Sequence, residues 1–178
     1  NPYLIKGICY HPVPKGETKR NFSSIAQDLQ LIQEAGINTI RVYAPIDKLE
    51  ILDQINAAGI KLIMGFGYNQ EGQFDIASGS ILDYIKKYKN HPAILFWELG
   101  NEYNYHPEWF EGDLANWYKA LNTTAQKIKA IDQNHPVATA HGEIPSEEVL
   151  RDNPNIDIWG VNAYRWDQPR SLITEWEE

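Results

Sequence analysis

The chain has 178 residues, of which 43% are hydrophobic, and it carries a formal net charge of -8. This length and apolar content are sufficient to bury a hydrophobic core. The acidity, without a cluster of Lys or Arg, argues against nucleic acid and anionic membranes as partners and favours a neutral ligand. No apolar run approaches the roughly 18 residues of a membrane-spanning helix, so no membrane span is expected. The N-terminus lacks a signal-peptide layout, and the compartment stays open, with an extracellular or periplasmic location favoured.

Strand-like and helical patterns alternate along the first half of the chain. Helical spacing of apolar residues begins near residue 25, Asn21 or Ser23 can cap this helix, and Gly36 can end it. Ser80 is expected to cap the third helix. Cys9, which has no intrachain partner for a disulfide, is expected to be a small buried hydrophobe in the first strand. The expected elements are strands at residues 3–10, 37–43 and 60–66, and helices at residues 25–35, 47–58 and 81–89.

The second half centres on residues 93–102, an apolar run that ends in glycine, an amide and a carboxylate. Its shortness and the preceding Pro92 indicate a buried strand. Further helices are expected at residues 114–131 and 146–151, and strands at 137–140 and 156–161. Strands separated by helices predict right-handed crossovers and a parallel sheet.

Six such strands predict an α/β fold of the TIM (β/α)8 class that is incomplete. A closed barrel needs eight strands and typically about 250 residues, so residues 1–178 are expected to form a single partial barrel domain. An open doubly wound sheet would be complete with six strands, but no Gly-rich phosphate loop opens any helix. Catalytic residues of such barrels project from the carboxyl ends of the strands, which is the position of Asn101 and Glu102.

The histidines give no indication of a metal site. Four of the five precede a proline, which favours roles in turns, and the sequence has no HExxH or CxxC spacing. We therefore expect neither a metal nor a cofactor. The four are His11, His91, His106 and His135.

Four motifs occur in order along the chain. They are KGICYHP at residues 6–12, GINTIRVY at 36–43, HP at 91–92 followed by WELGNE at 97–102, and WGVNAY at 159–164. Together they resemble the catalytic barrel of clan A glycoside hydrolases, in particular that of the family-two β-glycosidases, and they are also similar to fungal-type β-1,3-glucanosyltransferases. The resemblance implies a carbohydrate substrate and a retaining mechanism with two glutamates, in a glycoside hydrolase or a transglycosylase.

The resemblance also implies roles for individual residues. Glu102 matches the general acid/base, and Asn101 matches the residue that bonds the sugar 2-hydroxyl. Arg41 matches an arginine near the nucleophile, and Tyr164 matches a group that contacts the nucleophile carboxylate. The family's nucleophile is a Glu at the end of the seventh strand, which is expected beyond residue 178. The isolated chain is therefore expected to be inactive.

Further substrate-binding candidates are Asn162, His141, Tyr10 and Trp166. Asn162, like Tyr164, could instead be an ordinary core or loop residue, and His141 either touches substrate or closes its loop. Aromatic side chains in the loops can stack on the apolar faces of sugar rings, whereas Trp97, Trp117 and Trp159 are expected in the core. The loop aromatics are Tyr68, Tyr103, Tyr105, Trp109 and Trp166.

Two other glutamates need separate interpretations. Glu175 is a weak candidate for the nucleophile, because too few residues separate it from Tyr164 for a parallel crossover. Residues 171–178 are predicted to start a helix, with Glu175 as a solvated carboxylate. Glu98 is expected to pair internally, with Arg41 as its candidate partner.

A rival hypothesis is a non-catalytic carbohydrate-binding or scaffold protein built on a partial barrel. A partial barrel would expose two sheet edges and apolar surface. The chain is therefore expected to self-associate, or to bind a companion fragment that completes the barrel.

Overall fold

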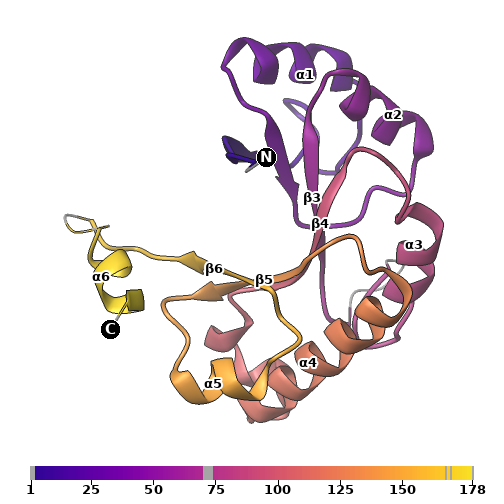
Figure 1. The fold of residues 1–178 in the computed structure, drawn as a ribbon. Helices are drawn as coiled ribbons and strands as arrows, with labels where there is room; N and C mark the ends of the chain where they lie inside the picture. Colours follow the sequence, from indigo (N-terminus) through magenta and orange to yellow (C-terminus); the bar gives the residue numbers. More distant parts are fainter. Residues whose placement is uncertain (1–2, 70–73, 167, 169, 178) are drawn as a thin grey trace.

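The computed structural model describes residues 3–69, 74–166, 168 and 170–177. Its six strands form one sheet in the order of the sequence, and each neighbouring pair is parallel. The sheet curls, with helices along its outer side (Figure 1), which confirms the predicted partial barrel. The strands are β1 (Gly7–Cys9), β2 (Thr39–Val42), β3 (Lys61–Phe66), β4 (Ile94–Asn101), β5 (Val137–Gly142) and β6 (Ile158–Asn162).

The helices alternate with the strands, as expected. Between β4 and the long helix α4 lie two short 3-10 helices, η1 (Tyr103–Tyr105) and η2 (Pro107–Phe110). None of the helices in the described part of the chain is long and apolar enough to cross a lipid bilayer. The α-helices are α1 (Ile25–Glu34), α2 (Leu49–Ala57), α3 (Ile81–Tyr88), α4 (Leu114–Ile131), α5 (Glu147–Asp152) and α6 (Ser171–Glu177).

The predicted helix caps were correct in one of two places. Ser80 is the N-cap residue of α3, as predicted, whereas the N-cap residue of α1 is Ser24 and not Asn21 or Ser23. Helix α1 starts after Ser24, whose side chain makes no capping bond. The Asn21 side chain does not reach the helix either, because it accepts from the Ser23 amide at 3.0 Å. The Ser80 hydroxyl accepts from the Asp75 backbone amide at 3.0 Å and makes no side-chain capping bond to α3. In both places a local turn uses the polar side chain that a cap would need.

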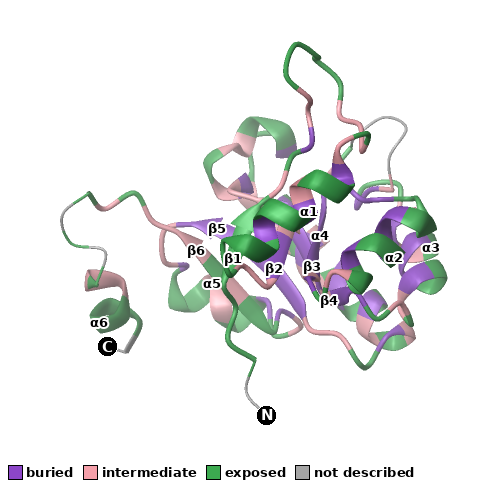
Figure 2. Cartoon of the chain, turned by 90° about the horizontal axis from the view of Figure 1, so that it is seen from above, coloured by how far each residue is buried: buried purple, intermediate pink, exposed green. Residues whose placement is uncertain are grey.

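The main core lies between the sheet and the helices. Buried residues concentrate on the strands and on the helix faces toward them (Figure 2). Trp97 and Trp117 are buried there, as predicted. A smaller cluster of Ile63, Phe96 and Ala138 lies apart from this core. Burial of apolar residues in two clusters agrees with the near-continuous hydrophobic runs of parallel strands.

The outer strands depart from the predictions. Pairing of β1 with β2 begins only at Gly7, so the first strand is shorter than the expected residues 3–10. Every residue of β1 is exposed, and the prediction that Cys9 is buried was wrong. Trp159 on β6, predicted to lie in the core, is only partly buried. The exposure of Cys9 and the partial burial of Trp159 follow from the position of their strands at the edges of the sheet. Within the described chain, β1 and β6 each have a single neighbouring strand.

Candidate active site

The carboxyl end of β4 has an irregular backbone. The pairing of β4 with β5 shifts register between Glu98 and Asn101, and both Gly100 and Glu102 have positive φ angles, 72° and 56°. A Cβ atom on Gly100 would lie only 2.7 Å from the ring of Trp117, so glycine is required there for steric as well as conformational reasons. This turn places Asn101 and Glu102 in succession at the end of the sheet where ligands of parallel folds bind.

Arg41 and Glu98 form a buried ion pair beneath this turn, as the sequence predicted. The Arg41 Nε atom donates to both carboxylate oxygens of Glu98, at 2.8 and 3.0 Å, and Nη2 lies 2.6 Å from Oε1. Burial raises the pKa of Glu98, and Arg41 opposes this rise. Burial alone would lower the pKa of Arg41, but the bonds to Glu98 outweigh it and raise that pKa. Arg41 is therefore a fixed cation.

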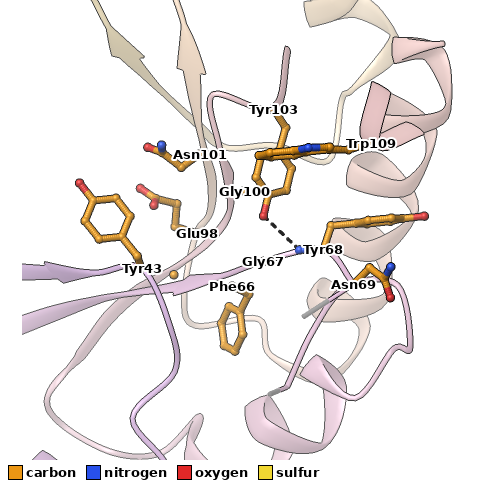
Figure 3. Close-up of a pocket in the computed structure, with 11 residues that line it drawn as sticks. Tyr43, Phe66, Gly67, Tyr68, Asn69, Glu98, Gly100, Asn101, Tyr103 and Trp109 are labelled. Atoms are coloured by element: carbon orange, nitrogen blue, oxygen red, sulfur yellow. Dashed lines mark hydrogen bonds between the residues drawn. The ribbon is translucent and has the colours of Figure 1, made fainter. Parts of the chain in front are cut away.

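Arg41 also fixes the orientation of Asn101. The Oδ1 atom of Asn101 accepts from Arg41 Nη2 at 2.9 Å and from the side-chain amide of Asn162 at 3.1 Å. Two donors at one atom identify it as the oxygen. The NH2 group of Asn101 is thereby turned away from both partners, in a residue that lines a cavity (Figure 3). This group can donate to a ligand hydroxyl.

Tyr164 contacts Glu102. Its hydroxyl donates to Glu102 Oε1 at 2.6 Å, and this bond raises the pKa of the Tyr164 hydroxyl. The next residue, Arg165, bonds Glu175 on α6 and Glu143 after β5, and its hydrogen bonds to these two carboxylates raise its pKa. Residues 171–177 are helical, as predicted, so Glu175 is a helix carboxylate paired with Arg165.

Three further candidates lie apart from this group. Both ring nitrogens of His141 already have partners, the Tyr118 hydroxyl at 2.9 Å and the Glu143 carbonyl at 2.8 Å, and burial lowers its pKa. This geometry favours the loop-closing role for His141. The Tyr10 hydroxyl donates to Asp28 on α1 at 2.6 Å, so Tyr10 points toward the helix layer. Trp166 is fully exposed.

A cavity of about 520 Å³ opens beside the ion pair. Two of its polar lining residues, Tyr43 and Asn69, were not among the candidates predicted from the sequence. Tyr43 could have been found, because it directly follows a strand end, two residues after Arg41. Its hydroxyl donates to Cys9 Sγ at 3.1 Å, and this bond, followed by burial, raises the pKa of Tyr43. The lining residues are Tyr43, Gly65, Phe66, Gly67, Tyr68, Asn69, Glu98, Gly100, Asn101, Tyr103 and Trp109.

Comparison with known families agrees with this geometry. The family described as glycosyl hydrolases family 2, TIM barrel domain, matches residues 2–165. The chain belongs to this family. The predicted resemblance to family-two β-glycosidase barrels is thus confirmed over nearly the whole chain. Among the described residues of this family 2 barrel, no group of three or more His, Cys, Asp or Glu side chains is arranged to hold a metal ion.

Individual relatives of this family 2 barrel are distant. The crystal structure of a β-glucuronidase from Bacteroides uniformis superposes with a TM-score of 0.75 at 21% identity, over 98% of this chain and 23% of that one. A 1,3-β-glucanosyltransferase of Saccharomyces cerevisiae is 23% identical, over 97% of this chain and 44% of the relative. A β-glucuronidase of Sus scrofa is 26% identical, over 91% of this chain and 26% of the relative. The chain thus spans less than half the length of these relatives.

Proposed function

We propose that this barrel supplies the general acid/base, Glu102, of a retaining enzyme that hydrolyses or transfers β-linked glycosides. The observation that carries the proposal is the Asn101–Glu102 pair at the carboxyl end of β4, where Arg41 and Asn162 fix the amide of Asn101. The names of the relatives support β-linked sugars as the substrate class, since they are a 1,3-β-glucanosyltransferase and β-glucuronidases.

The chemistry assigns a task to each polar group. Cleavage of an acetal requires a proton on the leaving oxygen and a carboxylate against the developing oxocarbenium ion. Glu102 gives its proton to the leaving oxygen and then, as a base, removes a proton from water or from an acceptor sugar hydroxyl. The NH2 group of Asn101 donates to the sugar 2-hydroxyl, a bond that strengthens in the transition state. Tyr164 positions the carboxylate of Glu102.

The second carboxylate of a retaining site lies about 5 to 5.5 Å from the acid/base. Glu98 is a poor candidate because both of its oxygens are held by Arg41. Glu175, which lies on α6, is paired with Arg165. The proposal therefore places the nucleophilic glutamate in sequence outside residues 1–178, in the same or a companion polypeptide. Residues 1–178 alone are then expected to bind sugars without turnover.

The test measures hydrolysis of an aryl β-glucoside and an aryl β-glucuronide by the complete gene product that contains residues 1–178. Glu102→Gln should lower kcat by about 10²- to 10⁴-fold, the usual contribution of a general acid or base. Glu111→Gln is the matched control, because Glu111 lies in the same connection between β4 and α4 with a similar positive φ of 60°. NMR should show that the first-formed sugar keeps its β configuration.

Two results would contradict the proposal. Equal losses in the two variants would mean that Glu102 has no special role. Sugar binding without any turnover by the complete gene product would favour a non-catalytic carbohydrate-binding protein.

Association with a second polypeptide forms part of the proposal. The two outer strands present exposed apolar side chains, among them Ile8 on β1 and Ile158 on β6. Unpaired strand edges with apolar side chains favour pairing with another chain. In sedimentation, residues 1–178 should therefore either self-associate or form a complex with a companion fragment that completes the barrel. A monomer that melts cooperatively would contradict this expectation.

A further inference from the structure

The cavity at the strand ends has two chemically different ends. On one side of Gly100 lie the polar side chains of Tyr43, Glu98 and Asn101. On the other side lie the aromatic rings of Tyr68, Tyr103 and Trp109 (Figure 3). Gly67 lies between these two groups (Figure 3), and Gly65 also lines the cavity. The volume of about 520 Å³ is in the range that drug-sized ligands occupy, about 300 to 1,000 Å³. A single sugar ring is considerably smaller than such ligands.

The aromatic end is held in place by its own contacts. The Tyr103 hydroxyl accepts from the Tyr68 backbone amide at 3.1 Å and so joins the loop after β3 to η1. The Tyr68 ring packs edge-on against Phe110, with centroids 5.0 Å apart. Tyr68 is therefore held against η1 and η2 before any ligand binds.

Trp109 on η2 is exposed, but two neighbouring rings pack against it. Its side chain is 52% exposed, although the His106 ring stacks on it at 3.9 Å with an angle of 6° between planes. Tyr103 packs against it nearly perpendicularly, with centroids 5.3 Å apart. A large aromatic ring held at the border of a cavity loses little entropy when a ligand covers it. Its flat apolar surface suits the apolar face of a sugar ring.

We infer that Trp109, with Tyr68 and Asn69, forms a second sugar subsite, and that the substrates are oligosaccharides of at least two sugar units. One unit lies against Asn101 and Glu98, and the adjacent unit lies against Trp109. Asn69 also lines the cavity, next to Tyr68 (Figure 3), and its side chain carries an amide that can bond the hydroxyls of the second unit. This inference rests on the proposed function, because the first unit is placed by Asn101, which the proposed reaction uses.

The test compares ligands of different length by isothermal titration calorimetry with the complete gene product that contains residues 1–178, carrying Glu102→Gln throughout so that no ligand is turned over. The ligands are methyl β-glucoside, methyl β-glucuronide, and a disaccharide and a tetrasaccharide of β-1,3-linked glucose. The disaccharide should bind about threefold to tenfold more tightly than the better methyl glycoside, as one aromatic contact predicts. Trp109→Ala should abolish this gain and leave the affinity for the methyl glycosides unchanged.

Trp176→Ala is the control, because Trp176 on α6 is 48% exposed and lies outside the cavity lining. It should retain the gain. Equal affinities for all lengths, or a gain that persists in Trp109→Ala, would overturn the subsite. Asn101→Ala tests the proposed function separately, since it should weaken binding of the methyl glycosides. If Asn101→Ala changes nothing while the length effect depends on Trp109, the subsite stands and the proposed function fails. Binding of no sugar at all would overturn both.

Discussion

The Arg41–Glu98 ion pair makes a strong prediction about stability. Arg41→Met removes the cation and keeps most of the side-chain volume. The Arg41 and Glu98 side chains are only 14% and 9% exposed, so the substitution leaves a buried carboxylate without its partner. Breaking such a pair from one side costs about 3 to 5 kcal/mol, which is a large part of the 5 to 15 kcal/mol that typically stabilises a domain.

The double variant Arg41→Met/Glu98→Leu separates the charge from the packing. Replacing both members of a buried pair by apolar residues of similar size is often neutral or stabilising, so the double variant should be more stable than Arg41→Met alone. The measurement is urea unfolding followed by tryptophan fluorescence. A single variant that loses less than about 1 kcal/mol, or a double variant less stable than the single one, would refute the reasoning.

The cost of Arg41→Met should also depend on pH. Burial raises the pKa of Glu98 and Arg41 opposes this rise, so the pKa of Glu98 rises further in the variant. The folded variant then holds a proton that the unfolded chain releases, and its stability falls as the pH rises above the ordinary glutamate value of about 4.3. The destabilisation should therefore be smaller in acid than at neutral pH, and a pH-independent cost would contradict this account.

Two further substitutions test the packing around the β4–α4 connection. Gly142→Ala would make the new Cβ atom clash with the ring of Tyr105. Displacement of this ring should lower the free energy of unfolding, measured in urea, by about 1 to 3 kcal/mol. An unchanged stability would mean that Tyr105 moves without cost. Asp113 caps α4 by accepting from the Ala115 amide at 2.9 Å. Asp113→Ala should lower the free energy of unfolding by about 0.5 to 2 kcal/mol, and Asp113→Asn should lower it much less. Equal losses in the two variants would contradict the capping role.

The order of the strands could be predicted because each apolar run is followed by a helical pattern. The position of Glu102 could also be predicted, because the run before it ends abruptly at Gly100. The register shift between Glu98 and Asn101 could not, since it arises from contacts between β4 and β5 that leave no local pattern. The same reason applies to the exposure of Cys9, which depends on how many strands flank β1.

The polar side chains were harder to place than the elements that carry them. Tyr10 belongs to a motif at a strand end, yet its hydroxyl bonds Asp28 on α1. The direction of a side chain just beyond β1 is set by such tertiary partners, which the sequence does not show. The Arg41–Glu98 pair could be anticipated, because a buried charge needs a partner of opposite charge.

The central claim, that Glu102 is a general acid, is tested most directly by the dependence on the leaving group. The complete gene product and its Glu102→Gln variant would be compared on a series of aryl β-glycosides by the rate of the first bond cleavage. A poor leaving group needs the proton and should lose about 10²- to 10⁴-fold in the variant, whereas a strongly activated phenol should cleave at nearly the original rate. An equal loss across the whole series would contradict the assignment of Glu102 as the proton donor.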